Sequence, residues 1–78
     1  MSQKIGKRNT QQREIIFEII NEAKGPVTVN EIVQKAADMD VQVGIATVYR
    51  TVKLLLSKEK IQAVTLPDGQ SRYESAKL

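Results

Sequence analysis

The chain of 78 residues carries a formal net charge of +3 and contains neither cysteine nor histidine. It therefore lacks thiol nucleophiles, the commonest general base and the ligands that zinc takes in almost every site. A chain this short also lacks the walls of a substrate pocket, so length and composition predict one domain that is not an enzyme.

The sequence contains no apolar stretch near the roughly 18 residues that span a bilayer. Its first residues also lack the apolar run that is found in secretory signals. We therefore expect a cytoplasmic protein that does not enter a membrane.

Charge is distributed unevenly along the chain. Residues 1–13 carry four cations and no acid, residues 14–40 carry six acids against two cations, and residues 41–58 carry three cations and no acid. Two basic blocks on either side of an acidic one suggest a basic face opposite an acidic face, and a polyanion is the natural partner of a basic face. Charge clusters also occur on ordinary surfaces, so charge alone leaves a nucleic-acid partner open.

The N-terminal part of the chain predicts a basic, flexible arm followed by a helix. Residues 1–8 are polar and basic and are interpreted as the arm. Asn9 or Thr10 can cap the helix, and the spacing of Asn9 and Gln12 resembles a capping box. Apolar residues then recur at helical spacing up to the stop signal Lys24-Gly25-Pro26, namely Ile15, Ile16, Ile19, Ile20 and Ala23.

Two further helices follow in close succession. Thr28 and Glu31 form a capping box at the start of the second helix, which ends near Met39. The link 40–43 leads to a third helix from about Gly44 to Lys58. Its predicted buried face comprises Ile45, Val48, Val52, Leu55 and Leu56.

After the third helix the apolar period changes to two. Ile61, Ala63 and Thr65 alternate with Gln62, Val64 and Leu66, which indicates a strand with two faces. The turn signal Pro67-Asp68-Gly69-Gln70 and the returning strand 71–75 complete a hairpin, which must pack against the helices to be stable. The fold class is therefore mainly α with a small β-hairpin: a winged helix-turn-helix of three helices and a two-stranded wing over residues 9–78.

In a helix-turn-helix the second helix of the unit enters the DNA major groove. Here this is the third helix of the chain, and its predicted outward face carries Ala46, Tyr49, Arg50 and Lys53. We expect Ala46, Tyr49 and Arg50 to read bases and Lys53, Thr47 and Thr51 to bind phosphates. As alternatives, Tyr49 shields the edge of the core and Lys53 is an ordinary solvated lysine.

Residues outside the third helix supply weaker candidates. Arg13 and Arg8 are expected to bind the DNA backbone, and Lys7 and Arg8 of the arm to reach the minor groove. Gln70 and Arg72 flank the wing turn and are expected to touch the backbone. A disordered arm and a solvated turn remain the alternatives.

The motif residues resemble the ferric uptake regulator (Fur) family over about residues 7–75. The likeness rests on four segments: Arg8–Arg13, Thr28–Ile32, Gly44–Val52 with its Thr-Val-Tyr-Arg core, and Gly69–Glu74. The resemblance implies a prokaryotic transcription regulator that binds operator DNA as a homodimer. It also implies zinc and iron, or another divalent metal, in a second domain after the wing.

The chain departs from the family pattern in its metal-binding residues. Glu74 matches a family metal ligand, but Pro26 stands where many members have a histidine ligand. Outside the ligands, Lys60 stands where the family usually has a glycine before the first wing strand. We therefore expect no metal site or cofactor in this chain, which is either part of a longer regulator or a naturally short relative.

These observations predict sequence-specific binding of double-stranded DNA, with an inverted-repeat operator and a repressor function. The alternative is a winged helix used as a protein-interaction or dimerisation module without specific DNA readout. An apolar outward face on the third helix would favour that alternative, whereas Arg50 and Lys53 favour DNA.

Overall fold

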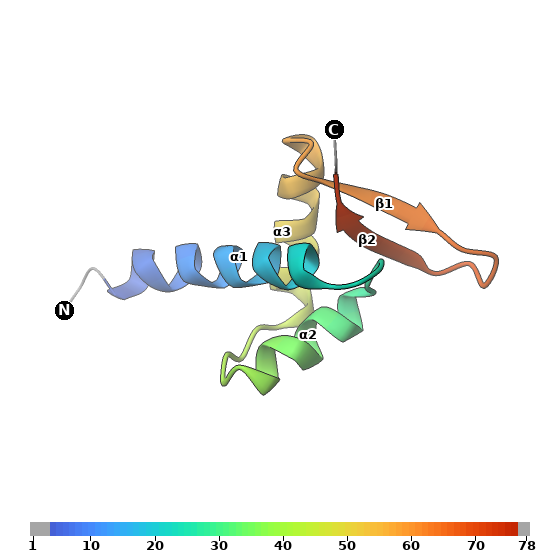
Figure 1. Ribbon diagram of the computed structural model, residues 1–78. Coiled ribbons are helices and arrows are strands. Elements are labelled where there is room, and N and C mark those ends of the chain that lie inside the picture. Colours follow the sequence, from blue (N-terminus) through green and yellow to red (C-terminus); the bar gives the residue numbers. More distant parts are fainter. Residues whose placement is uncertain (1–3, 77–78) are drawn as a thin grey trace.

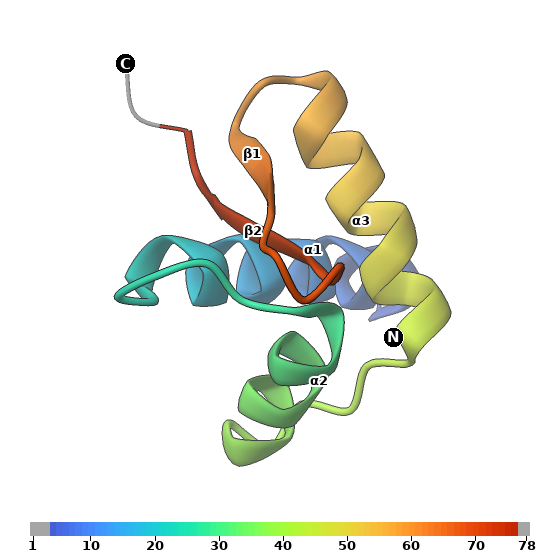
Figure 2. The ribbon, with the colours of Figure 1, turned by 90° about the vertical axis from the view of Figure 1, so that its right-hand side faces the viewer.

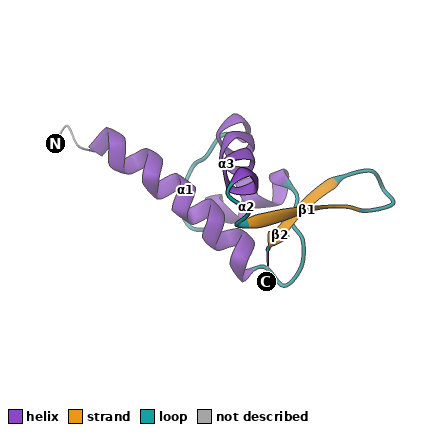
Figure 3. Ribbon diagram, turned by 90° about the horizontal axis from the view of Figure 1, so that it is seen from above, coloured by secondary structure: helices purple, strands orange, loops and turns teal. Residues whose placement is uncertain are grey.

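The computed structural model describes residues 4–76. Three helices are followed by a two-stranded antiparallel hairpin (Figure 1), in the order α1 (Lys4–Glu22), α2 (Val29–Asp38), α3 (Ile45–Ser57), β1 (Ile61–Thr65) and β2 (Ser71–Ser75). This arrangement confirms the predicted winged helix-turn-helix. The hairpin and the N-terminal end of α1 project from opposite sides of the domain (Figure 3).

The first helix begins earlier than the sequence pattern predicts. α1 starts at Lys4, so residues 4–8 of the expected flexible arm are helical and residues 1–3 lie outside the described residues. Asn9 and Gln12 stand inside the helix and do not cap its start. The physical reason is that Lys4, Lys7 and Arg8 are good helix formers and that no proline interrupts the segment, which offsets the weak helix propensity of Gly6.

The second helix has the N-terminal cap that its sequence predicts. The Thr28 hydroxyl accepts a hydrogen bond from the Glu31 amide at 3.1 Å, and the Glu31 carboxylate accepts one from the Thr28 amide at 2.8 Å. At the other end Asp40 takes the left-handed conformation with φ 62°, which aspartate tolerates better than most residues. This residue turns the chain sharply toward α3.

The third helix buries one face against the first two helices. Gly44 caps its start without a side chain, and the buried residues are Val48, Thr51, Val52 and Leu55. Ile45 is 48% exposed, so its predicted place in the core is wrong. At the end of α3 Glu59 adopts φ 59° and directs the chain into β1.

The hairpin pairs in register from Ile61 with Ser75 to Thr65 with Ser71. Gly69 takes φ 84° in the connecting turn, as the turn signal predicts. The predicted buried face of the first strand is only partly correct, since Ile61 is buried whereas Ala63 and Thr65 are exposed. The reason is that the hairpin packs on the helices at its base and extends away from them toward its turn (Figure 1).

A backbone contact anchors the hairpin to the segment before α2. Val27 and Tyr73 form an antiparallel bridge, with hydrogen bonds of 2.9 Å from the Val27 amide and 2.8 Å from the Tyr73 amide. Figure 2 shows this segment passing below β2 on its way to α2. The bridge fixes the hairpin relative to the helices. This support is needed because an isolated two-stranded ribbon is only marginally stable in water.

The hydrophobic core lies where the three helices meet. Its five most deeply buried large side chains come from all three of them: Ile16, Ile20, Ile32, Val48 and Val52. Ile61 and Tyr73 extend the core under the hairpin. Because α3 is held on this side, its opposite face remains open to solvent.

Candidate nucleic-acid interface

The solvent-facing side of α3 carries the four residues that the sequence pattern predicts there. Ala46, Tyr49, Arg50 and Lys53 are all exposed, and Tyr49 is 51% exposed. They lie at helical spacing opposite the buried residues, which places them on one surface. We call these four residues the α3 face.

The cations of the α3 face are not neutralised by the protein itself. Within the part of the chain that the structure describes, the single ion pair joins Arg72 to Asp68. Arg50 and Lys53 have no acidic partner there, and no acid occurs between residues 41 and 58. Their positive charge is therefore available to an external anion.

The two threonines of α3 differ in their exposure. Thr47 is half-buried at the edge of the α3 face. Thr51 is only 3% exposed, so its hydroxyl is not available to a phosphate and the expected phosphate contact is wrong. Thr51 lies three residues after Val48 and four before Leu55, and this spacing puts it on the buried side of the helix.

An ion pair holds the turn of the hairpin. Arg72 donates to both carboxylate oxygens of Asp68, at 3.3 Å from Nη1 and 3.0 Å from Nη2. The backbone amide of Gln70 donates to Oδ1 of Asp68 at 3.0 Å. The hydrogen bonds from Arg72 and then from the Gln70 amide lower the pKa of Asp68. Arg72 therefore braces the turn, while the Gln70 side chain is exposed.

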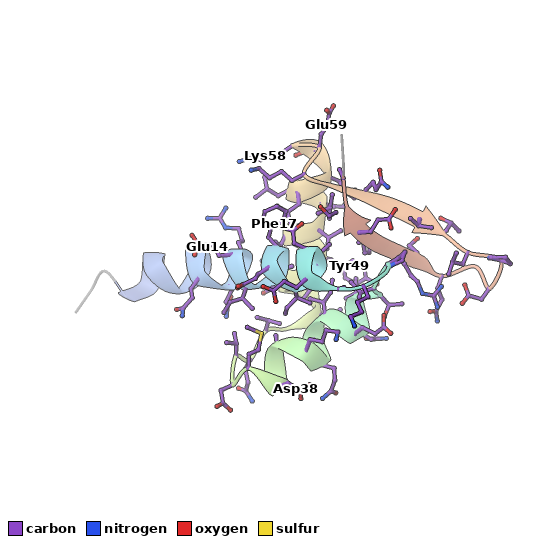
Figure 4. The ribbon with its side chains drawn as sticks, viewed as in Figure 1. Glu14, Phe17, Asp38, Tyr49, Lys58 and Glu59 are labelled. Atoms are coloured by element: carbon purple, nitrogen blue, oxygen red, sulfur yellow. The ribbon has the colours of Figure 1, made fainter. Side chains whose placement is uncertain are left out.

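A groove of about 320 Å³ lies between the start of α2, the α3 face and the hairpin. Figure 4 shows Tyr49 on the side of α3 toward the hairpin. The lining residues are Thr28, Val29, Asn30, Tyr49, Gln70, Ser71 and Tyr73. Asn30 is exposed in the first turn of α2 and lines this groove, although the sequence pattern did not mark it as a site residue.

The remaining predicted cations lie on α1. Arg13 is exposed. Lys7 and Arg8 belong to the helix, but their side chains lie outside the described residues. Lys60, after α3, places its Nζ 5.6 Å from the centre of the Phe17 ring, so it faces α1 and not the α3 face.

The residues present do not fit a metal ion. Among the described residues no group of three or more His, Cys, Asp or Glu side chains is placed to hold one. Glu74 accepts a hydrogen bond of 2.6 Å from the Gln62 amide group, so its carboxylate already has a partner in the neighbouring strand. In residues 4–76 no helix is both long and apolar enough to cross a membrane.

Comparison with known proteins identifies the family. The sequence profile of the Ferric uptake regulator family matches residues 4–78. The chain is 37% identical over 70 residues to the ferric uptake regulation protein of Rhizobium leguminosarum bv. viciae and 38% identical over 71 residues to that of Brucella suis biovar 1. These matches cover 90% and 91% of this chain and 49% and 50% of the relatives.

Among solved structures, a zinc-bound manganese uptake regulator superposes with a TM-score of 0.78 at 35% identity. The match covers 85% of this chain and 50% of that one. The chain thus spans about half the length of the relatives it matches. The family profile extends over all but the first three residues, and the chain belongs to the ferric uptake regulator family.

Proposed function

We propose that this domain binds double-stranded DNA in a sequence-specific manner as part of a prokaryotic transcription regulator, with α3 in the major groove. The observation that carries the proposal is the α3 face, which combines a small residue, an exposed aromatic ring and two cations without acidic partners. The B-DNA major groove is about 12 Å wide and admits a helix of this kind.

Each residue of the α3 face has a distinct role in this complex. Arg50 donates two hydrogen bonds to a guanine, and Tyr49 contacts base edges with its ring. Ala46 allows the helix to approach closely and touches a thymine methyl group. Lys53 and Thr47 bind phosphates and fix the register of the helix on the duplex.

Residues on other elements bind the flanking backbone. Arg13 and Arg8 of α1 contact phosphates, and Lys7 and Arg8 extend toward the adjacent minor groove. Gln70 approaches the backbone from the hairpin. Arg72 acts indirectly, because its bonds to Asp68 hold the turn that presents Gln70.

The functional unit is a homodimer on an inverted repeat, and it acts as a repressor in the cytoplasm. Two copies would place their α3 helices in successive major grooves, about 34–36 Å apart along the duplex. The relatives extend well beyond the matched region, and we assign metal sensing and dimerisation in the absence of DNA to that further part, whereas two copies of this domain come together on the operator. A single domain then binds DNA weakly and with a steep dependence on salt.

The test is selection of bound duplexes from a random DNA pool, followed by the mass of the complex on the enriched sequence. We expect enrichment of an inverted repeat that binds two copies of the domain. Enrichment of a single half-site that binds one copy would support sequence-specific binding and would reject dimer formation by this domain on DNA. Failure to enrich any sequence would reject specific readout and favour a protein-interaction module.

A further inference from the structure

Ile45 is a large apolar residue that the fold leaves exposed at the start of α3. It is the first residue of the helix and is 48% exposed. The core is built without it, since the buried face of α3 is supplied by Val48, Val52 and Leu55. The exposed half of Ile45 therefore contributes little to folding.

Exposure alone does not single out Ile45, because isolated apolar side chains are common on protein surfaces. Met39 is equally exposed at 48%, but it caps the end of α2 and is not part of α3. Ile45 differs in its position. It precedes Tyr49 by four residues, so the two side chains lie on adjacent turns of the same side of the helix.

Ile45, Ala46 and Tyr49 together form an apolar patch at the N-terminal end of α3. This end of a recognition helix is the part that contacts base edges. Gly44, next to the patch, is exposed, and a Cβ atom added to it would meet no heavy atom of another residue beyond its chain neighbours within 4 Å. Arg50 follows Tyr49 directly and Lys53 lies one turn further along α3, and both are exposed, so they provide positive charge beside the patch.

The chemistry of the patch selects one kind of contact in the groove. Among the base edges of the major groove, only thymine presents an apolar group, its 5-methyl. An aliphatic side chain has no hydrogen bond to offer the other bases. We infer that Ile45 is a specificity-determining residue that packs on a thymine methyl group beside the bases contacted by Tyr49 and Arg50; this inference rests on the proposed function.

The experiment replaces single thymines of the enriched site by deoxyuridine, which removes only the 5-methyl group. The wild-type domain should lose about fourfold in affinity at the thymine that Ile45 contacts, the value for one methyl group returned to water. Ile45→Ala should weaken binding to the unmodified site and should show no further loss at that position. The two changes are then coupled, as expected for groups in contact.

Met39→Ala is the matched control, because it removes an equally exposed apolar side chain from the C-terminal cap of α2. It should keep the full deoxyuridine effect, and thermal unfolding should show that both variants are folded. The inference is overturned if Ile45→Ala retains the wild-type sensitivity at every thymine. It is also overturned if no thymine substitution affects the wild-type domain while Arg50→Ala still abolishes specific binding, a result that leaves the proposed function intact.

Discussion

The prediction that tests the proposed DNA contacts most directly is the effect of Arg50→Ala. Arg50 is exposed, and no acid of the described residues pairs with it. Its truncation therefore removes no internal contact that the fold depends on. We expect the melting temperature to stay close to the wild-type value, so that any loss of binding reports on the interface.

The size of the loss follows from the role of the side chain. A bidentate contact to guanine contributes about 1–3 kcal/mol of discrimination, which is roughly fivefold to 140-fold in affinity. Loss of a single phosphate contact weakens specific and random DNA alike and lowers the salt slope by about 1. Lys53, one turn further along α3, is expected to behave in this second way.

The assay is fluorescence anisotropy with the selected site and with a scrambled duplex, each over a range of salt concentrations. Arg50→Ala should reduce the ratio of the two affinities, whereas Lys53→Ala should leave the ratio unchanged and lower the slope. Equal losses on both duplexes for Arg50→Ala would refute base reading and leave Arg50 a phosphate contact.

Three further predictions concern the core, the cap of α2 and the turn of the hairpin. Val48→Ala removes two fully buried methyl groups and should lower the free energy of unfolding by about 2–3 kcal/mol, or the melting temperature by roughly 10–20 °C. Val64 is half-buried, so Val64→Ala should lower the free energy of unfolding by less than half as much. Equal losses for the two variants would contradict the assigned core. Thr28→Ala removes the capping side chain of α2 and should cost about 1 kcal/mol in chemical denaturation, whereas an unchanged value would mean that the cap is not formed in solution. Carboxyl NMR titration should place the pKa of Asp68 below the reference value of 3.8, and Arg72→Ala should raise it. Because the folded state lowers this pKa, the stabilisation of the fold by ionised Asp68 is fully present above the unfolded-state pKa and is lost as pH falls through the folded-state pKa. An Asp68 pKa that does not change in Arg72→Ala would exclude the ion pair.

The features that were predicted correctly from the sequence depend on interactions between near neighbours in the chain. The capping box of Thr28 and Glu31 joins residues three apart, and the turn at Gly69 needs only one residue that tolerates positive φ. The exposed positions of Tyr49 and Arg50 follow from helical periodicity alone.

The errors share a different origin. The capping pattern at Asn9 predicts a later start of α1 than the structure has, because Lys4, Lys7 and Arg8 favour the helix and no proline interrupts them. Thr51 was assigned by its chemistry, although its spacing from Val48 already put it on the buried side of α3. The helical spacing therefore predicts burial of Thr51, although its polar side chain suggests an exposed position.

Other features required the tertiary structure. Ile45 fits the apolar period of α3 and yet is exposed, because no helix covers the first turn at that point. The bridge between Val27 and Tyr73 joins segments that are distant in sequence, so no local sequence pattern predicts it.

The sequence by itself thus determined the order of the elements, the capping box of α2, the turn at Gly69 and the cationic side of α3. The tertiary structure alone decided which apolar residues are covered, how the hairpin is anchored, and that Tyr49 borders a groove with α2 and the hairpin. The physical reason is that hydrogen bonds and dihedral preferences act between neighbours, whereas burial depends on which other element packs opposite a residue.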